Sequence, residues 1–367
     1  MQIISIVPRL PPVIDGVGDY ALNLAKQLRK DFGIGTHFIV GDPSWSNNRE
    51  IKNFPVSEVK LRSAPRLLSV LADQGFASNR SATILLHYVG YGYAKRGCPF
   101  WLINGLQKWR SANVNSSLVT MFHELYATGP IWASSFWLSP VQKNLAIRLS
   151  RLSNRCLTSE ERYAQTLYQF TLGKQAEIPN LPVFSNIGEP EKVPPLAQRP
   201  RRLIVFGGSS NRQRVYQKSL AALESTCQEL KIEQIVDVGP PLSVTISSVS
   251  GIPVVTMGKR TVSEISQLLL SCIGGFFDYN TDYLAKSTIF AAYCAHGLIP
   301  IGIFYSQLEF NGLSPGKHYW LADRPTGKLN LEVGQAIADN AYAWYQTHNL
   351  SLHAKTFADQ LKTIMAN

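Results

Sequence analysis

The clearest structural signal in this chain is the run Ser287-Thr288-Ile289-Phe290-Ala291-Ala292-Tyr293-Cys294-Ala295-His296-Gly297-Leu298-Ile299-Pro300-Ile301-Gly302. It predicts a helix that a hydroxyl residue caps and a glycine ends, followed directly by a short apolar strand. A helix start presents unpaired backbone N–H groups and the positive end of the helix dipole, so it suits an anion such as a diphosphate. The same run also fits an ordinary unit of a doubly wound sheet that binds nothing.

Apolar and amphipathic segments alternate along the rest of the chain. Strands are expected at 3–7, 36–40, 82–87, 117–122, 156–158, 203–206, 234–238, 254–256, 274–277 and 299–303. Helices are expected at 17–30, 140–151, 160–170, 215–230, 262–270 and 287–295, with further helices over 331–366. This alternation predicts the α/β class, with mostly parallel, doubly wound, Rossmann-like sheets covered by helices on both faces.

Residues 189–202 separate the two alternations and have the composition of a linker, with four prolines between 188 and 202. We therefore expect a first domain at 1–188 and a second at 203–348. The last helix, 349–367, is expected to pack back on the first domain. A chain of 367 residues is long enough for two cores of ordinary size.

Composition narrows the class of protein. No apolar run approaches the roughly 20 residues that span a bilayer, and the first residues lack the features of an export signal. The five cysteines are scattered without metal-binding spacing, which is typical of reduced cysteines in a cytoplasmic protein. The net charge of +11 lies mainly in residues 1–190 and favours an acidic substrate or an anionic membrane surface, with peripheral association on the inner membrane surface as one option. No nucleic-acid partner is expected, because no nucleic-acid-binding motif is found.

The run Gly16-Val17-Gly18-Asp19-Tyr20-Ala21 matches the GxGxx(G/A) pattern of dinucleotide-binding loops. Asp42 follows the next expected strand, where such proteins hold a ribose, so an NAD or FAD oxidoreductase is one interpretation. The pattern normally follows the first strand directly, whereas here the proline-rich residues 8–15 intervene. The other interpretation is a long, stiff loop whose glycines let the backbone approach a ligand from the facing side.

Six segments of the chain share their order and composition with one known family. They are the glycine loop with Leu24-Ala25-Lys26-Gln27-Leu28 behind it, Val119-Thr120-Met121-Phe122-His123-Glu124, Cys156–Glu160, Leu203–Gly208, Val255–Leu270 and Ser287–Gly302. Together they resemble the glycosyltransferases of the GT-B fold, in particular family 4, also called group 1. The resemblance implies two Rossmann-like domains facing a cleft, with the acceptor mainly on the first and the donor mainly on the second. It implies transfer of a sugar from a UDP- or GDP-sugar to a hydroxyl of a glycan, lipid or small molecule, with no further cofactor.

The resemblance and the residue chemistry together nominate site residues. Catalytic roles are expected for His123, which would contact the transferred sugar or move a proton, for Glu124, which would orient the acceptor hydroxyl, and for Asp19 as a base. Acceptor contacts are expected from His87, Tyr88 and Tyr91. Donor contacts are expected from Gly16, Val17, Gly18, Arg212, Arg214, Lys218, Gly258, Lys259, Lys286, Ser287 and Thr288. Cations and helix-start amides suit a leaving diphosphate whose charge grows, but each residue also has a structural interpretation, as a helix cap, a buried hydrogen-bonding group or a solvated charge.

One part of the family pattern is missing. Its two glutamates, eight residues apart, would fall at Leu284 and Ala292 when the chain is aligned on Gly297. One of them normally contacts the sugar and the other the donor ribose, so a non-catalytic nucleotide-sugar-binding homologue and a sugar-nucleotide epimerase stay open as alternatives. Asp278 and Asp282 lack the spacing of a DxD metal motif, and cationic side chains already supply countercharge, so no essential metal is expected.

Overall fold

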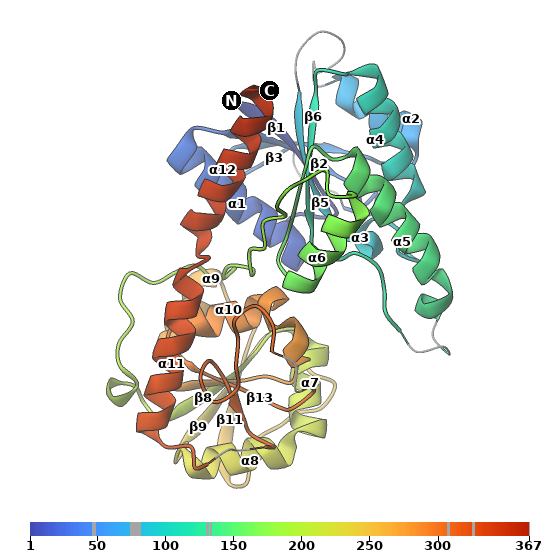
Figure 1. Ribbon diagram of the computed structural model, residues 1–367. Helices are drawn as coiled ribbons and strands as arrows, with labels where there is room; N and C mark the ends of the chain where they lie inside the picture. The colour runs from blue at the N-terminus through green and yellow to red at the C-terminus, as the bar shows by residue number, and fades with distance from the viewer. Residues whose placement is uncertain are drawn as a thin grey trace. The chain divides into compact units, whose positions relative to one another are not determined.

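The computed structural model describes residues 1–45, 49–73, 82–129, 132, 134–306, 309–324 and 327–366. The chain divides into two compact units, Met1–Pro182 with Leu350–Asn367 and Val183–Asn349. Each unit holds one seven-stranded sheet flanked by helices (Figure 1). The expectation of an α/β protein with two Rossmann-like sheets is confirmed.

The first unit is a mainly parallel sheet in the order β3-β4-β2-β1-β5-β6-β7, with β3 antiparallel to β4. Its strands are β1 (Gln2–Val7), β2 (Gly35–Val40), β3 (Glu50–Ile51), β4 (Phe54–Glu58), β5 (Thr83–Tyr88), β6 (Ser117–Phe122) and β7 (Arg155–Thr158). Its helices are α1 (Gly16–Phe32), α2 (Ala64–Leu71), α3 (Gly90–Tyr93), α4 (Phe100–Ala112), α5 (Ser134–Leu152), α6 (Glu161–Phe170) and α12 (Leu350–Ala366).

The second unit repeats this topology in the order β10-β11-β9-β8-β12-β13-β14, with β10 antiparallel to β11. Its strands are β8 (Arg202–Phe206), β9 (Gln234–Val238), β10 (Ser248–Val249), β11 (Ile252–Gly258), β12 (Gly274–Phe276), β13 (Ile299–Gly302) and β14 (Trp320–Leu321). Its α-helices are α7 (Ser209–Lys218), α8 (Leu220–Glu229), α9 (Val262–Leu270), α10 (Thr288–Ala295) and α11 (Leu331–Gln346), and the 3₁₀ helices are η2 (Leu196–Gln198) and η3 (Thr281–Lys286). Strand by strand, β1 thus corresponds to β8, β2 to β9, β5 to β12 and β6 to β13.

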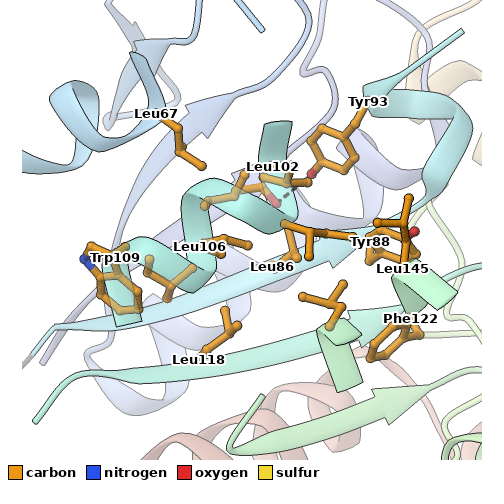
Figure 2. Close-up of a cluster of buried hydrophobic side chains, with 14 of the residues drawn as sticks. Leu67, Leu86, Tyr88, Tyr93, Leu102, Leu106, Trp109, Leu118, Phe122 and Leu145 are labelled. Carbon is orange, nitrogen blue, oxygen red and sulfur yellow. Dashed lines mark hydrogen bonds between the residues drawn. The ribbon is translucent and has the colours of Figure 1, made fainter. Parts of the chain in front are cut away.

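The core on one side of the first sheet joins β5 and β6 to the helices that cover them. Tyr93 ties this core to the sheet, because its hydroxyl donates to Ile6 O at 3.1 Å and to His87 O at 3.0 Å. Figure 2 shows side chains of this cluster converging from strands and helices: Leu67, Leu86, Tyr88, Leu102, Leu106, Trp109, Leu118, Phe122 and Leu145. This packing holds the carboxyl ends of β5 and β6 in place.

The terminal helix α12 packs along α1 in the first unit, although the whole second unit separates them in sequence (Figure 1). Tyr20 of α1 and His353 of α12 share a buried hydrogen bond of 2.9 Å between Oη and Nδ1. The chain therefore returns to the unit where it began. Asn367, the last residue of the helix expected at 349–367, lies outside the described residues.

Two helices differ from their expected form. The helix expected at 215–230 is two helices, α7 and α8, because the chain turns at Ser219, whose Oγ donates to Asp278 Oδ2 at 2.8 Å. The helix expected to start at Pro140 starts at Ser134 and carries the proline inside it. None of the described helices is both long and apolar enough to cross a bilayer.

The boundary between the two units lies at Pro182 and Val183. Residues 189–202, expected as a linker, belong to the second unit. The reason is Arg199, whose Nη1 donates to Cys272 O and whose Nη2 donates to His296 O, both at 2.9 Å. These bonds hold the proline-rich segment against the second unit.

Candidate functional site

The turn after β8 is fixed by a buried ion pair. Gly207 has a φ of 133°, a conformation that favours glycine, and α7 begins two residues later. Arg212 of α7 is 1% exposed and pairs with Asp237 of β9. It also donates to Gly207 O at 3.0 Å and to Pro240 O. Because these bonds lie within the unit, the structure argues against the donor-binding role expected of Arg212, which instead joins the ends of β8 and β9.

Asp278, just after β12, gathers several donors at the same edge of the sheet. Its carboxylate accepts from Ser219 Oγ at 2.8 Å and from Tyr305 Oη at 2.5 Å. Arg214 donates from Nη2 to Asp278 O at 2.8 Å, and its Nε lies 3.4 Å from Asp278 Oδ1. The Arg214 side chain is 36% exposed, and Lys218 in the last turn of α7 is exposed. Of the three cations expected here, Arg214 and Lys218 therefore reach the surface.

A small pocket lies at the carboxyl ends of β8 and β12. On one side it is bounded by α7 and on another by the residues that begin α10. Its lining residues are Val205, Phe206, Asn211, Arg212, Val215, Phe276, Phe277, Asp278, Tyr279, Ser287 and Ile289. Crevices at the carboxyl ends of parallel strands are where open α/β sheets bind ligands.

The start of α10 has the cap that the sequence predicts. Ser287 is the N-cap residue, and its Oγ accepts from the amide of Phe290 at 3.2 Å. Thr288, the first residue of the helix, is half-buried. Lys286 is also half-buried, and its Nζ lies 5.4 Å from the centre of the Tyr283 ring. An ammonium, two hydroxyls and a helix start thus lie together in sequence and structure beside the pocket.

The glycine expected beside the donor ends β11. Gly258 has a φ of 67°, which favours glycine, and its carbonyl accepts from the amide of Gly239 at 3.1 Å. Lys259 follows it and is exposed. The turns after β9 and β11 are therefore tied together, with a surface cation next to them.

In the first unit, the carboxyl ends of β5 and β6 bring two histidines together. His87 Nδ1 and His123 Nε2 are 3.2 Å apart, and the two rings stack with 5.5 Å between their centres. Tyr20 of α1 packs edge-on against both rings. Both imidazoles are buried, His87 fully and His123 with 7% of its surface exposed. His123 is the one closer to solvent, as a role at the substrate requires.

The histidine pair continues through Tyr20 to His353 of α12. His353 Nε2 lies 2.9 Å from Pro182 O, so Nε2 carries the proton and Nδ1 accepts from the Tyr20 hydroxyl. Burial lowers the pKa of His87 to about 3 and that of His353 to about 4. Both rings are therefore neutral at physiological pH.

The remaining residues expected at the acceptor differ in exposure. Tyr88 is fully buried, and its hydroxyl has no hydrogen-bond partner among the described residues. Tyr91 is 44% exposed and accepts from Gln142 Nε2 at 3.2 Å. Glu124 follows His123 and is half-buried. Of these side chains, Tyr91 and Glu124 reach the surface, whereas Tyr88 belongs to the core.

The glycine loop begins α1, and its amides already have an anionic partner. Asp15 Oδ1 accepts from the amides of Val17 at 3.0 Å and Gly18 at 2.9 Å. A Cβ on Gly18 would lie 2.3 Å from Arg9 O, whereas a Cβ on Gly16 would meet nothing within 4 Å. The second glycine therefore allows close packing of the helix on its own loop. The structure argues against a diphosphate on the Val17 and Gly18 amides.

Two further carboxylates lie near this loop. Asp42, the residue expected to hold a ribose in a dinucleotide enzyme, accepts from Arg9 Nε at 2.5 Å and from Ser44. Asp19 is half-buried, and its burial, together with the Asp15 charge, raises its pKa to about 6. A carboxyl group with this pKa exchanges its proton near neutral pH, which suits the base role expected of Asp19.

Sequence reasoning missed several partners in these networks. Asp237 is an acid inside an apolar strand, a signal that marks a buried pair, but its partner Arg212 is 25 residues away. Tyr305 and His353 carried no signal of their own. Within the described ranges no three His, Cys, Asp or Glu side chains form a metal-binding group, and the expected lack of a metal stays a prediction.

Comparison with known proteins defines the fold. No protein-family model matches the sequence, and no curated protein matches it either. Among solved structures, HepE of Anabaena in complex with UDP-glucose has a TM-score of 0.60 and 13% identity, over 99% of this chain and 100% of that chain. WaaG, a glycosyltransferase involved in lipopolysaccharide biosynthesis, has a TM-score of 0.60 and 12% identity, over 97% and 98%.

A third similar structure is the lipopolysaccharide outer core galactosyltransferase WaaB, with a TM-score of 0.58 and 11% identity over 99% of both chains. At such identities the likeness shows the fold. The fold is the one that GT-B glycosyltransferases have, with one Rossmann-like sheet in each of two units. The expected GT-B fold is thus confirmed over the full length of the chain.

Proposed function

We propose that this chain is a glycosyltransferase that moves a sugar from a nucleotide-diphosphate sugar to an acceptor hydroxyl. The observation that carries the proposal is the Ser287-capped start of α10, which borders a small pocket at the carboxyl ends of β8 and β12. Arg214, Lys218 and Lys286 add positive charge near the same edge. Charge grows on a nucleotide diphosphate as the glycosidic bond breaks, and fixed cations and a helix dipole stabilise it.

The donor is proposed to be a UDP- or GDP-sugar. HepE, whose fold is similar, was crystallised with UDP-glucose, which favours UDP. Ser287 and Thr288 would contact the diphosphate, Arg214 and Lys218 would neutralise it, and Gly258 and Lys259 would lie near the base. Because these cations supply the countercharge, no metal is part of the proposal. Membership of glycosyltransferase family 4 is proposed on the sequence resemblance.

The acceptor is proposed to be a glycan or a lipid-linked molecule bound at the carboxyl edge of the first sheet. His123 and Glu124 directly follow β6; His123 is 7% exposed and Glu124 is half-buried. Asp19, with a pKa of about 6, would accept the proton of the acceptor hydroxyl. A cytoplasmic protein that works at the inner membrane surface fits this assignment.

A non-catalytic nucleotide-sugar-binding protein is the second candidate. The family's two glutamates correspond to Leu284 and Ala292, which are 1% and 0% exposed, so neither position offers a polar contact to a ligand. An epimerase would act without an acceptor. An oxidoreductase is disfavoured because Asp15 occupies the helix-start amides and Asp42 is bonded to Arg9.

The test is ligand binding followed by transfer. Thermal stability of the purified chain is measured with UDP, GDP, ADP, their sugar conjugates, NAD(P) and FAD, since a ligand that binds the folded state raises its stability. We expect stabilisation by one nucleoside diphosphate and its sugar. The double variant S287A/T288A should weaken that binding at least about tenfold, the effect of losing one hydrogen bond to a charged group.

The matched control is N330A. Asn330 caps α11 in the same unit through the amide of Val333 at 2.9 Å, so this variant loses a cap away from the pocket and should bind normally. Release of free or acceptor-linked sugar from the stabilising donor separates the enzyme from the non-catalytic protein. Stabilisation by a dinucleotide alone, or equal nucleotide affinity in S287A/T288A and the wild type, contradicts the proposed site.

A further inference from the structure

One hydrogen bond joins the two buried histidines at the carboxyl ends of β5 and β6, and its direction determines what His123 can do. His87 Nδ1 and His123 Nε2 are 3.2 Å apart. A neutral imidazole has one donor nitrogen and one acceptor nitrogen, so either ring can supply the proton of this bond. The direction of the bond therefore sets which nitrogen is protonated in each ring.

The backbone and the packing around the pair hold the two rings at this distance. The Tyr93 hydroxyl donates to His87 O at 3.0 Å, and the amide of His123 donates to Tyr88 O at 3.0 Å. The Tyr20 ring packs edge-on against both imidazoles, with 5.8 Å between its centre and that of His87 and 5.0 Å to that of His123. The contact between the two nitrogens is therefore built into the core of the first unit.

The second nitrogen of His87 indicates the direction of the bond. His87 Nε2 is buried and has no hydrogen-bond partner within the described ranges. His87 lines a small cavity together with Ala21 and Ala25 of α1, and neither of the hydroxyls in that cavity, Ser5 Oγ and Thr36 Oγ1, bonds it. A buried N–H group without an acceptor is rare in folded proteins, rarer than a buried lone pair without a donor. The proton of His87 therefore belongs on Nδ1, where it has an acceptor.

The tautomer of His123 follows from that of His87. Burial lowers the pKa of His87 to about 3, so this ring is neutral and has a single proton. If that proton is on Nδ1, His123 Nε2 accepts it in the hydrogen bond, and a neutral His123 then carries its own proton on Nδ1. His87 is 0% exposed and His123 7%. The ring nearer to solvent thus has its lone pair bonded by the ring behind it.

We propose that His87 is a positioning residue that keeps His123 in the Nδ1–H tautomer, so that His123 donates a hydrogen bond and does not act as a base. The sequence leaves two roles open for His123, contact with the transferred sugar and movement of a proton. With its lone pair engaged by His87, His123 takes no proton from an acceptor hydroxyl, and the base role is left to Asp19. The group that His123 recognises is then an oxygen with a lone pair, such as a sugar hydroxyl. This role at the substrate rests on the proposed glycosyl transfer, whereas the tautomer does not.

The test is NMR of the full chain with isotope-labelled histidine, because protonated and unprotonated ring nitrogens differ clearly in chemical shift. Loss of signals in H123N assigns those of His123. We expect Nδ1 of His123 to be protonated and Nε2 to be unprotonated. H87L removes the donor to His123 Nε2 and should change the ratio of the two His123 tautomers about tenfold toward Nε2–H, the effect of losing one hydrogen bond. H87N places an amide N–H where Nδ1 lies and should restore the wild-type ratio.

The matched control is S5A. Ser5 lines the same cavity as His87, and its hydroxyl has no partner within the described ranges, so S5A changes this part of the core and should keep the wild-type signals of His123. Thermal melting checks that every variant is folded. The proposal is overturned if wild-type His123 is protonated on Nε2, or if folded H87L has the wild-type ratio of tautomers. The wild-type spectrum alone shows the direction of the bond, so a failure of H87L to fold leaves the proposal testable.

A second measurement connects the tautomer to sugar transfer. With the donor and acceptor that the wild type uses, kcat/KM should fall in H87L by the factor by which the Nδ1–H fraction of His123 falls. It should recover in H87N and stay at the wild-type value in S5A. A wild type without transfer activity contradicts the proposed function and leaves the NMR result unaffected. Wild-type kcat/KM in an H87L variant whose His123 has changed tautomer overturns the role of His87 in transfer.

Discussion

Each unit has an arginine–aspartate ion pair at the carboxyl ends of two neighbouring strands, but the two pairs differ in burial. In the first unit Arg9, after β1, bonds Asp42, after β2, with the Arg9 side chain 41% exposed. In the second unit Arg212, after β8, bonds Asp237 of β9, and both side chains are 1% exposed. The first pair joins two loops at the surface, whereas the second pair is buried in the core next to the pocket.

The carboxyl edges of the two sheets also differ in the charge of the side chains behind them. The edge of the first sheet is built around neutral rings, since His87 and His353 have pKa values of about 3 and 4. The edge of the second sheet is ionic, with Asp278 next to Arg214 and Asp237 next to Arg212. One topology therefore places neutral histidine rings behind the carboxyl edge of the first sheet and two arginine–aspartate contacts behind that of the second.

The largest expected effect comes from the buried pair. Asp237→Ala leaves the Arg212 guanidinium in the core without its countercharge, so we expect the second unit to lose about 3–5 kcal/mol of unfolding free energy. Asp42→Ala leaves Arg9 in contact with solvent and should cost the first unit about 1 kcal/mol. Hydrogen exchange of peptides from each unit measures the two losses separately. Equal losses of unfolding free energy would show that burial does not determine how much each ion pair contributes to stability.

Sequence reasoning found the regular parts of this fold because they depend on local patterns. The apolar runs at β1, β6 and β8 predicted strands within a residue or so of their observed bounds, and the cap of α10 at Ser287 is confirmed. Helix α4 was missed, since its Gly105 weakens the helical signal. The structure explains that glycine: a Cβ there would lie 2.8 Å from Leu67 Cδ2 of α2.

The site was less predictable, because exposure and partners depend on residues far along the chain. Arg212 and Arg214 look alike in sequence, and only the fold shows that one is buried against Asp237 and the other reaches the surface. Tyr20 and His353 are 333 residues apart. Local sequence patterns can identify a candidate cation or histidine, but they cannot show which distant residue it bonds.

The second-largest expected effect is a loss of about 2–3 kcal/mol in the unfolding free energy of the first unit at acid pH. Burial lowers the pKa of His353 in the folded state to about 4, below the ordinary histidine value of 6.5. As pH falls from 6.5 toward 4, the unfolded chain binds protons that the folded ring does not, so stability falls over this window and is fully present above it. His87, with a pKa of about 3, adds a loss of the same sign, and protonation of Asp19 near pH 6 opposes it in part.

The variant His353→Gln tests the contribution of His353 to this loss of stability, because glutamine keeps a donor for Pro182 O and does not titrate in this range. The stability of the first unit should then fall less steeply between pH 6.5 and 4, measured by hydrogen exchange of α1 and α12 peptides. His296→Gln is the matched control in the second unit, where burial also lowers the histidine pKa to about 4. It should flatten the acid response of the second unit alone. An unchanged slope in His353→Gln contradicts a neutral, buried His353.

The smallest expected effect concerns the glycine pairs that follow β1 and β8. Gly18→Ala places a methyl group 2.3 Å from Arg9 O and should destabilise the first unit by about 1–3 kcal/mol. Gly16→Ala meets nothing within 4 Å and should be neutral or stabilising by up to about 1 kcal/mol, because alanine loses less entropy in a helix.

The second unit supplies the matched pair for this experiment. Gly207 has a φ of 133°, and its Cβ would lie 2.4 Å from Ile289 Cδ1, whereas a Cβ on Gly208 would meet nothing within 4 Å. Gly207→Ala should therefore destabilise its unit and Gly208→Ala should not, as measured by urea unfolding. A loop that binds a dinucleotide pyrophosphate needs both of its glycines, because the ligand must approach the backbone closely. The packing role of this loop is therefore contradicted if the wild type binds a dinucleotide and Gly16→Ala does not. Unchanged stability in Gly16→Ala, beside a destabilised Gly18→Ala, would show that the first glycine loop shapes the first unit through packing.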